Sequence, residues 1–119
     1  MSRGRLVLIH WHAEEAELLA APLRKDGWDV AVEWEDGARA GKAILADPPA
    51  AVVVYLTRLP SHGRETMHGL RAYKAGRTIP ILFVDGAPDT VEKTRAKVRD
   101  ARFVAEEGLK KALARYASP

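Results

Sequence analysis

Short apolar runs alternate with segments of helical periodicity along the whole chain. Runs such as Leu6–Ile9 and Val52–Val54 are continuously apolar, which indicates strands that are covered on both faces. The run that starts at Trp28 alternates apolar and polar residues, as expected of a strand near a sheet edge with one drier face. The pattern predicts strands over Arg5–His10, Trp28–Trp34, Ala50–Leu56, Ile79–Val84 and Ala101–Ala105.

A segment with helical spacing of apolar residues follows each of these runs. Gly27 and Gly76 are placed to end two of the helices, and Asp89 is placed to cap another. Pro22 lies inside the first helix, where its missing N–H donor predicts a kink. The predicted helices span Ala13–Asp26, Gly37–Ala46, Arg64–Ala75, Thr90–Arg99 and Glu107–Tyr116.

The elements therefore form consecutive strand–helix units. Apolar strands that each lead into a helix predict a parallel sheet with helices on both faces, which is a three-layer α/β sandwich. Right-handed connections and a length of 119 residues favour a flavodoxin-like fold with five strands in the order 2-1-3-4-5. The chain is expected to form one domain over residues 1–119.

The composition is that of an ordinary globular protein, with 47% hydrophobic and 29% charged residues. The absence of cysteine excludes disulfides, thiolate catalysis and cysteine-held metal clusters, and it favours a cytoplasmic location. No apolar run approaches the roughly 20 residues of a membrane helix, and no targeting segment is expected. The sequence predicts no cofactor.

Two features of the predicted surface bear on partners. The formal net charge is only +3, and the densest basic segment, Lys93–Arg102, has the spacing of a solvated helix face. A stripe that contacts nucleic-acid phosphates is the alternative, which the small basic excess does not favour. The tryptophans are expected to pack in the core and at its edges, with Trp34 a candidate for an exposed partner surface.

The best place for a binding site is the carboxyl edge of the predicted sheet. Ligands of such sheets bind where the strands end, near the reversal of strand order between the first and third strands. We predict a strand-end pocket at this edge, formed by His10, Trp11, His12, Tyr55, Arg58, Ser61, His62 and Asp85.

The segment Ala51–Gly63 carries a specific pattern, an apolar strand followed by Arg58-Leu59-Pro60 and then Gly63. Together with the order of elements, it resembles the receiver domains of bacterial response regulators, the CheY-like superfamily, over nearly the whole chain. The resemblance implies a flavodoxin-like fold and a role in signal transduction. It also implies an acidic pair that holds Mg²⁺, a phosphoryl-accepting aspartate, a Ser or Thr, and a Lys at successive strand ends.

None of these positions holds the residue that a phosphorylated receiver uses. They hold His10 and Trp11, then Tyr55 or, if the loop proline sets the alignment, Leu56, then Asp85, and then Ala105 or Glu106. The sequence therefore predicts a non-catalytic pseudo-receiver that is not phosphorylated on aspartate. We expect it to contact a protein partner of unknown identity through the last two helices and the strand between them, or through the strand-end pocket. Homodimerisation through the last two helices is an alternative that no particular residue supports.

A small-molecule or anion site, for phosphate or a nucleotide, is the main alternative function. Two arginines lie beside a predicted helix start, where an anion can be held. The opposing expectation is a rigid turn at Gly63, with Arg58 paired to a carboxylate such as Asp85. The anion site would use His10, His12, Arg58, His62 and Asp85.

Two sharper hypotheses on the same residues are weaker. His10 and His12 have a known metal-ligand spacing, but zinc needs three or four converging ligands and a second shell, so no metal site is predicted. Ser61, His62 and Asp85 are the residue types of a hydrolase triad. Adjacent Ser and His side chains are poorly placed for that chemistry, however, and the chain has no G-x-S-x-G elbow around Ser61.

Overall fold

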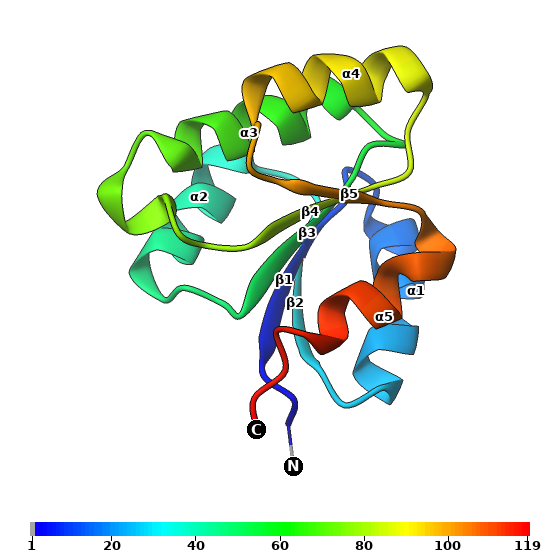
Figure 1. Cartoon of the computed structure of the whole chain (residues 1–119). Coiled ribbons are helices and arrows are strands. Elements are labelled where there is room, and N and C mark those ends of the chain that lie inside the picture. The colour runs from blue at the N-terminus through cyan, green and yellow to red at the C-terminus, as the bar shows by residue number, and fades with distance from the viewer. Residues whose placement is uncertain (1) are drawn as a thin grey trace.

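The computed structural model describes residues 2–119, which form a sheet of five parallel strands between two layers of helices (Figure 1). The strand order is β2-β1-β3-β4-β5, so the predicted 2-1-3-4-5 flavodoxin-like topology is confirmed. The strands are β1 (Arg5–Ile9), β2 (Asp29–Glu33), β3 (Ala51–Tyr55), β4 (Ile81–Val84) and β5 (Arg102–Val104).

The register of the central strands determines which residues meet at the carboxyl edge. Ile9 at the end of β1 lies opposite Val54 of β3, and Tyr55 lies opposite Val84 of β4. Because all the strands run in the same direction, the segments that follow β1, β3, β4 and β5 emerge at the same edge. The residues after Ile9 and Val54 are therefore neighbours, although they are far apart in the sequence.

Helices α1 and α5 cover one face of the sheet, and α2, α3 and α4 cover the other (Figure 1). Side chains alternate along each strand, so Leu8 and Val53 pack on the α1–α5 side, while Ile9 and Val54 pack on the opposite side. In the described part of the chain, no helix has the length and hydropathy to cross a bilayer. The helices are α1 (Ala13–Lys25), α2 (Gly37–Ala46), α3 (Pro60–Arg71), α4 (Pro88–Lys97) and α5 (Leu109–Ala114), with 3₁₀ turns η1 (Lys74–Gly76) and η2 (Glu106–Gly108).

Helix α3 begins at Pro60, four residues before the predicted start at Arg64. A proline suits the first helical position, because its φ is already helical and its missing N–H would have no partner there. Ser61 and His62 consequently lie in the first turn of α3 rather than in a loop. The turn expected at Gly63 is wrong, since this glycine is helical and is not among the residues with positive φ.

Other boundaries differ for similar local reasons. Helix α4 begins at Pro88, and Ala87 occupies the capping position, so Asp89 lies in the first turn and does not cap the helix. Helix α1 runs through Pro22 to its last residue, and Gly27 follows its end with φ 99°, as expected of a glycine helix stop. The last predicted helix is divided into η2 and the shorter α5. Trp11 and Trp28 are buried, while Trp34 is 43% exposed after β2.

Two glycines of α3 provide a matched test of the packing between this helix and the sheet. A Cβ at Gly63 would lie 2.7 Å from Val54 Cγ1, whereas a Cβ at Gly69 would have no atom within 4 Å. We expect Gly63→Ala to lower the free energy of unfolding by about 1–3 kcal/mol through overpacking. Gly69→Ala should raise it by about 0.5–1 kcal/mol through helix propensity. Urea unfolding of both variants measures the difference, and equal effects would contradict the close approach of α3 to β3.

Candidate functional site

A cleft of about 340 Å³ lies at the carboxyl edge of the sheet, on the side of α1. Its walls come from the end of β1, the first turns of α1, the end of β3, the loop after β4 and the start of η2. The strand ends thus form the floor of the cleft, and α1 forms one wall. The residues that line it are His10, Glu15, Leu18, Leu19, Tyr55, Thr57, Asp85 and Glu106.

The floor of the cleft consists of the His10 and Tyr55 rings, which are 1% and 2% exposed. Their centroids are 5.6 Å apart in an edge-to-face arrangement that follows from the β1–β3 register. His10 Nε2 is 2.8 Å from Glu15 Oε1, so the imidazole donates its Nε2–H to this carboxylate. His10 Nδ1 and the Tyr55 hydroxyl have no hydrogen-bond partner among the described residues.

Glu15 is held from two sides. The Arg58 guanidinium binds its carboxylate through both oxygens, with Nε 3.0 Å from Oε1 and Nη2 on Oε2. This pair, followed by the His10 hydrogen bond, lowers the pKa of Glu15 from 4.5 to about 2. Glu15 is therefore ionised at neutral pH, and the bidentate pair connects the first turn of α1 to the loop after β3.

The Tyr55 phenol remains neutral at physiological pH. Burial raises its pKa, and the nearby carboxylates of Glu106 and Asp85 raise it further. Although Glu106 is close enough to influence this pKa, the hydroxyl does not make a hydrogen bond of normal geometry with it. Tyr55 therefore contributes a neutral phenol to the cleft floor, close to the carboxylates of Glu106 and Asp85.

Asp85 fixes the shape of the cleft wall. It adopts φ 57°, a left-handed conformation that aspartate tolerates better than most residues. Its backbone N–H donates to the Val104 carbonyl at 3.0 Å, and its Oδ1 accepts the Glu106 N–H at 3.0 Å. The first bond connects the loop after β4 to the end of β5, and the second connects it to η2, whose Glu106 side chain lies at the cleft.

The opposite side of the same edge is apolar. Trp11 and Leu56 follow His10 and Tyr55 by one residue, so their side chains join the core under α2, α3 and α4. The Trp11 ring lies edge-to-face with His62 at 5.8 Å between centroids, and Leu56 is only 3% exposed. The two candidates for the end of β3, Tyr55 and Leu56, thus point to different faces of the sheet.

The structure divides the predicted pocket. His10, Tyr55 and Asp85 line the cleft. The other predicted members, Trp11, His12, Arg58, Ser61 and His62, do not line it. Glu15, Leu18 and Leu19 were missed, although helical spacing from the end of β1 places them on the wall nearest that strand.

The remaining hypotheses can be checked against the same geometry. His12 caps α1 by accepting the Glu15 N–H on Nδ1 at 3.3 Å, so it serves the helix while His10 faces Glu15. No group of three or more His, Cys, Asp or Glu within residues 2–119 is placed to hold a metal ion. Arg58 is paired to a carboxylate, as one expectation had it, but the partner is Glu15 and not Asp85, which had been named as an example.

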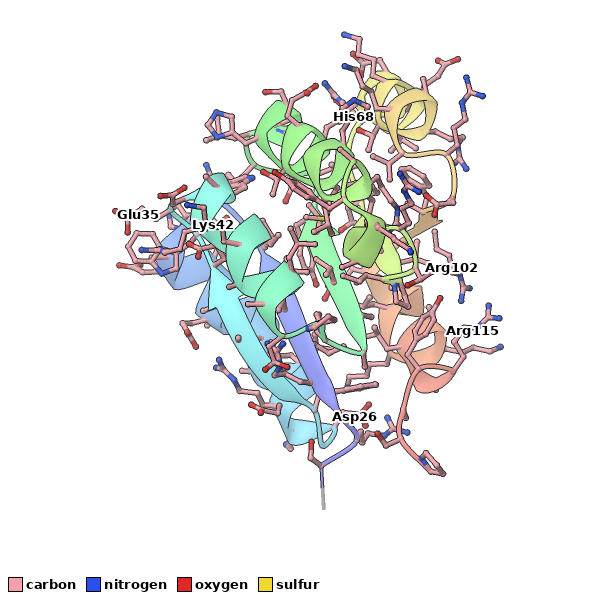
Figure 2. The ribbon with its side chains drawn as sticks, turned by 90° about the vertical axis from the view of Figure 1, so that its left-hand side faces the viewer. Asp26, Glu35, Lys42, His68, Arg102 and Arg115 are labelled. Carbon is pink, nitrogen blue, oxygen red and sulfur yellow. The ribbon has the colours of Figure 1, made fainter. Side chains whose placement is uncertain are left out.

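The edge beside β5 carries the opposite charge to the cleft. Arg95 of α4 lies 4.4 Å from the centre of the Phe103 ring. Figure 2 shows Arg102 and Arg115 at the same edge. A shallow groove there is lined by Arg102, Val104, Gly108, Lys111, Ala112 and Arg115. The molecule therefore presents a basic outer edge in addition to the acidic cleft.

No protein-family model matches the chain, and no curated protein matches its sequence. In structure it is similar to a sensor protein from Polaromonas sp. JS666, with a TM-score of 0.79, 22% identity, and coverage of 96% of this chain and 95% of that chain. A CheY-like response regulator receiver domain from Methylobacillus flagellatus gives a TM-score of 0.78 and 18% identity, covering 97% and 99%.

A third similar structure is the receiver domain of sensor histidine kinase PA1611 from Pseudomonas aeruginosa PAO1, which has a magnesium ion coordinated in its active site cleft. Its TM-score is 0.74 and its identity 17%, with 97% of this chain and 98% of that chain covered. At these identities the likeness establishes the CheY-like, flavodoxin-like fold.

The Glu15–Arg58 pair predicts an unusual carboxyl titration. In the wild-type protein, the ¹³C carboxyl signal of Glu15 should titrate near pH 2. Arg58→Gln should raise this pKa toward 4.5, because the largest stabilisation of the ionised form is removed. Arg39→Gln is the matched control, since Arg39 pairs with Glu33 instead. A Glu15 titration near 4.5 in the wild type would contradict the pairing.

The same shift predicts a pH-dependent contribution to stability. Because the folded-state pKa of Glu15 lies below its unfolded value, the contribution is complete above about pH 4.5 and is lost as the pH falls toward about 2. Glu15→Gln removes this component. The free energy of unfolding of the wild type should therefore fall toward that of the variant over this interval. Parallel pH profiles in urea unfolding would contradict the prediction.

Proposed function

We propose that this chain is a pseudo-receiver, a signalling module that acts through protein–protein contacts and does not accept a phosphoryl group on aspartate. The observation that supports this most strongly is the content of the carboxyl edge of the sheet. On one face, the buried side chains of Trp11 and Leu56 fill the space beyond β1 and β3. On the other face, His10 and Tyr55 form the floor of the cleft.

The chemistry of phosphoryl transfer explains why this content matters. Transfer to a carboxylate needs an accessible nucleophilic oxygen and a divalent cation that neutralises the developing charge. Mg²⁺ is bound by oxygen ligands in near-octahedral geometry. Indole, imidazole and aliphatic groups supply none of these oxygens. Of the three carboxylates that line the cleft, Glu15 is already bound to Arg58 and His10, and Asp85 accepts the Glu106 N–H, so two of the three have structural partners.

Two surfaces outside the blocked strand ends are suited to binding a protein partner. Leu18 is 73% exposed beside the cleft, and the outer edge formed by α4, β5 and α5 is basic. Either surface suits a protein contact, since exposed apolar and charged groups mark such sites. The anion-binding alternative has less support. Arg58 is occupied by Glu15, Arg64 donates to the Thr94 hydroxyl, and the cleft is lined by three carboxylates.

Exposure to a small phosphodonor tests this proposal. The protein is incubated with acetyl phosphate and Mg²⁺, and its intact mass is measured beside that of a receiver domain with a complete acidic site. We expect no phosphoryl adduct on this chain, whereas the control receiver should gain one. An adduct that maps to Asp85, Glu106 or Glu15 would contradict the proposal, because it would require a carboxylate that is free to attack.

A further inference from the structure

The charged side chains that line the cleft are all acidic. Glu15, Asp85 and Glu106 all contribute carboxylates, and neither lysine nor arginine is among the described residues that line it. Arg58 offsets the charge of Glu15 from outside, which leaves Asp85 and Glu106 without a cationic partner among the ion pairs of the described residues. Such a lining raises the local concentration of cations.

A buried polar atom beside these carboxylates, the Tyr55 hydroxyl, points to the same kind of ligand. The Tyr55 hydroxyl and His10 Nδ1 have no hydrogen-bond partner among the described residues, although both side chains line the cleft and are at least 98% buried. Buried polar groups nearly always have partners. The floor therefore offers the Tyr55 hydroxyl oxygen as an unused hydrogen-bond acceptor to a donor-rich ligand.

The rim of the cleft adds an apolar surface. Leu18 and Leu19 of α1 line the same cleft as the carboxylates, and Leu18 is 73% exposed. An alkyl chain that ends in a cationic group matches both parts. Its methylene groups would contact the leucines, while its charged end would reach the carboxylates.

We propose that this cleft binds an alkylammonium group, as carried by a lysine side chain of a partner protein or by a free alkyl amine. Three N–H donors on one cationic centre would bind to Glu106, Asp85 and the Tyr55 hydroxyl oxygen. Where the ligand is a lysine of a partner protein, this site would be one contact of the proposed pseudo-receiver with its partner, and the proposal then rests on the proposed function. Amine binding and the mass of a phosphoryl adduct are measured independently, so one proposal can fail while the other holds.

Amide NMR titration tests the proposal with defined probes. The cationic probes are N-acetyl-lysine methylamide and 1,4-diaminobutane, and the neutral control is the lysine probe acetylated on Nζ. Both cationic probes should shift the amide signals of residues at the cleft, such as His10, Leu18 and Glu106, and higher salt should weaken the effect. The acetylated probe should not shift them. Equal shifts with the acetylated probe, or no shifts with either amine, would overturn the proposal.

Matched variants locate the site. Glu106→Gln should weaken binding of the cationic probes about three- to fivefold, as expected for the loss of one partly solvated charge. Glu107→Gln is the control, because Glu107 is also exposed but does not line the cleft. Both variants should keep the wild-type dispersion of amide signals. Equal weakening by the two substitutions would show only general electrostatic attraction and would overturn the proposed site.

The Leu18→Ser variant distinguishes the two possible sources of the ammonium group, a partner lysine and a free amine. If the ligand is a partner side chain, a lysine peptide with flanking apolar residues should bind more tightly than 1,4-diaminobutane, and Leu18→Ser should remove that advantage. If the ligand is a free amine, the diamine should bind at least as tightly as the peptide, and the substitution should affect both equally. Either pattern supports an alkylammonium site. Tighter binding by an acetylated version of the peptide would contradict it.

Discussion

The pairing of β1 with β3 is the interaction on which the rest of this structure depends. Once Ile9 lies opposite Val54, the next residues of both strands must emerge together at the carboxyl edge. Alternation then sends His10 and Tyr55 to the α1 side and Trp11 and Leu56 to the other side. A slip of one residue in this register would exchange the polar and apolar sets, so the same ladder that stabilises the sheet also defines the cleft.

The charged groups at this edge have separate structural and binding roles. Glu15 is tied to Arg58 and His10, which connects α1 to the loop after β3 and lowers the pKa of its carboxyl group. Asp85 holds η2 in place through the Glu106 N–H, and the Glu106 side chain lies at the cleft without a salt-bridge partner among the described residues. The receiver-like fold thus has a polar strand-end cleft in which Glu15 and Asp85 also hold neighbouring elements together.

The sequence was sufficient for the fold but only partly for the site. Continuous apolar runs such as Val52–Val54 predicted the parallel sheet, because burial on both faces leaves a pattern that is local in sequence. The strand order was predicted from right-handed connections and the length of the chain. The starts of α3 and α4 were displaced, since Pro60 and Pro88 open these helices before their apolar spacing begins. The Arg58–Glu15 pair was not predicted, because 43 residues separate its members and nothing local distinguishes Glu15 from its acidic neighbours. His10, Tyr55 and Asp85 were found together because strand ends can be read from sequence, whereas the side to which each residue points depends on the register.

The proposed pseudo-receiver role requires that the carboxyl edge does not hold a phosphoryl group together with a metal ion. Beryllofluoride mimics an aspartyl phosphate, so titration with beryllofluoride and Mg²⁺ tests this requirement. Binding is followed by ¹⁹F NMR and by the amide signals of Leu56, Asp85 and Glu106. If the chain is a pseudo-receiver, we expect no bound ¹⁹F signal and unchanged amide positions up to millimolar beryllofluoride. A bound ¹⁹F signal accompanied by magnesium-dependent shifts at these residues would contradict it.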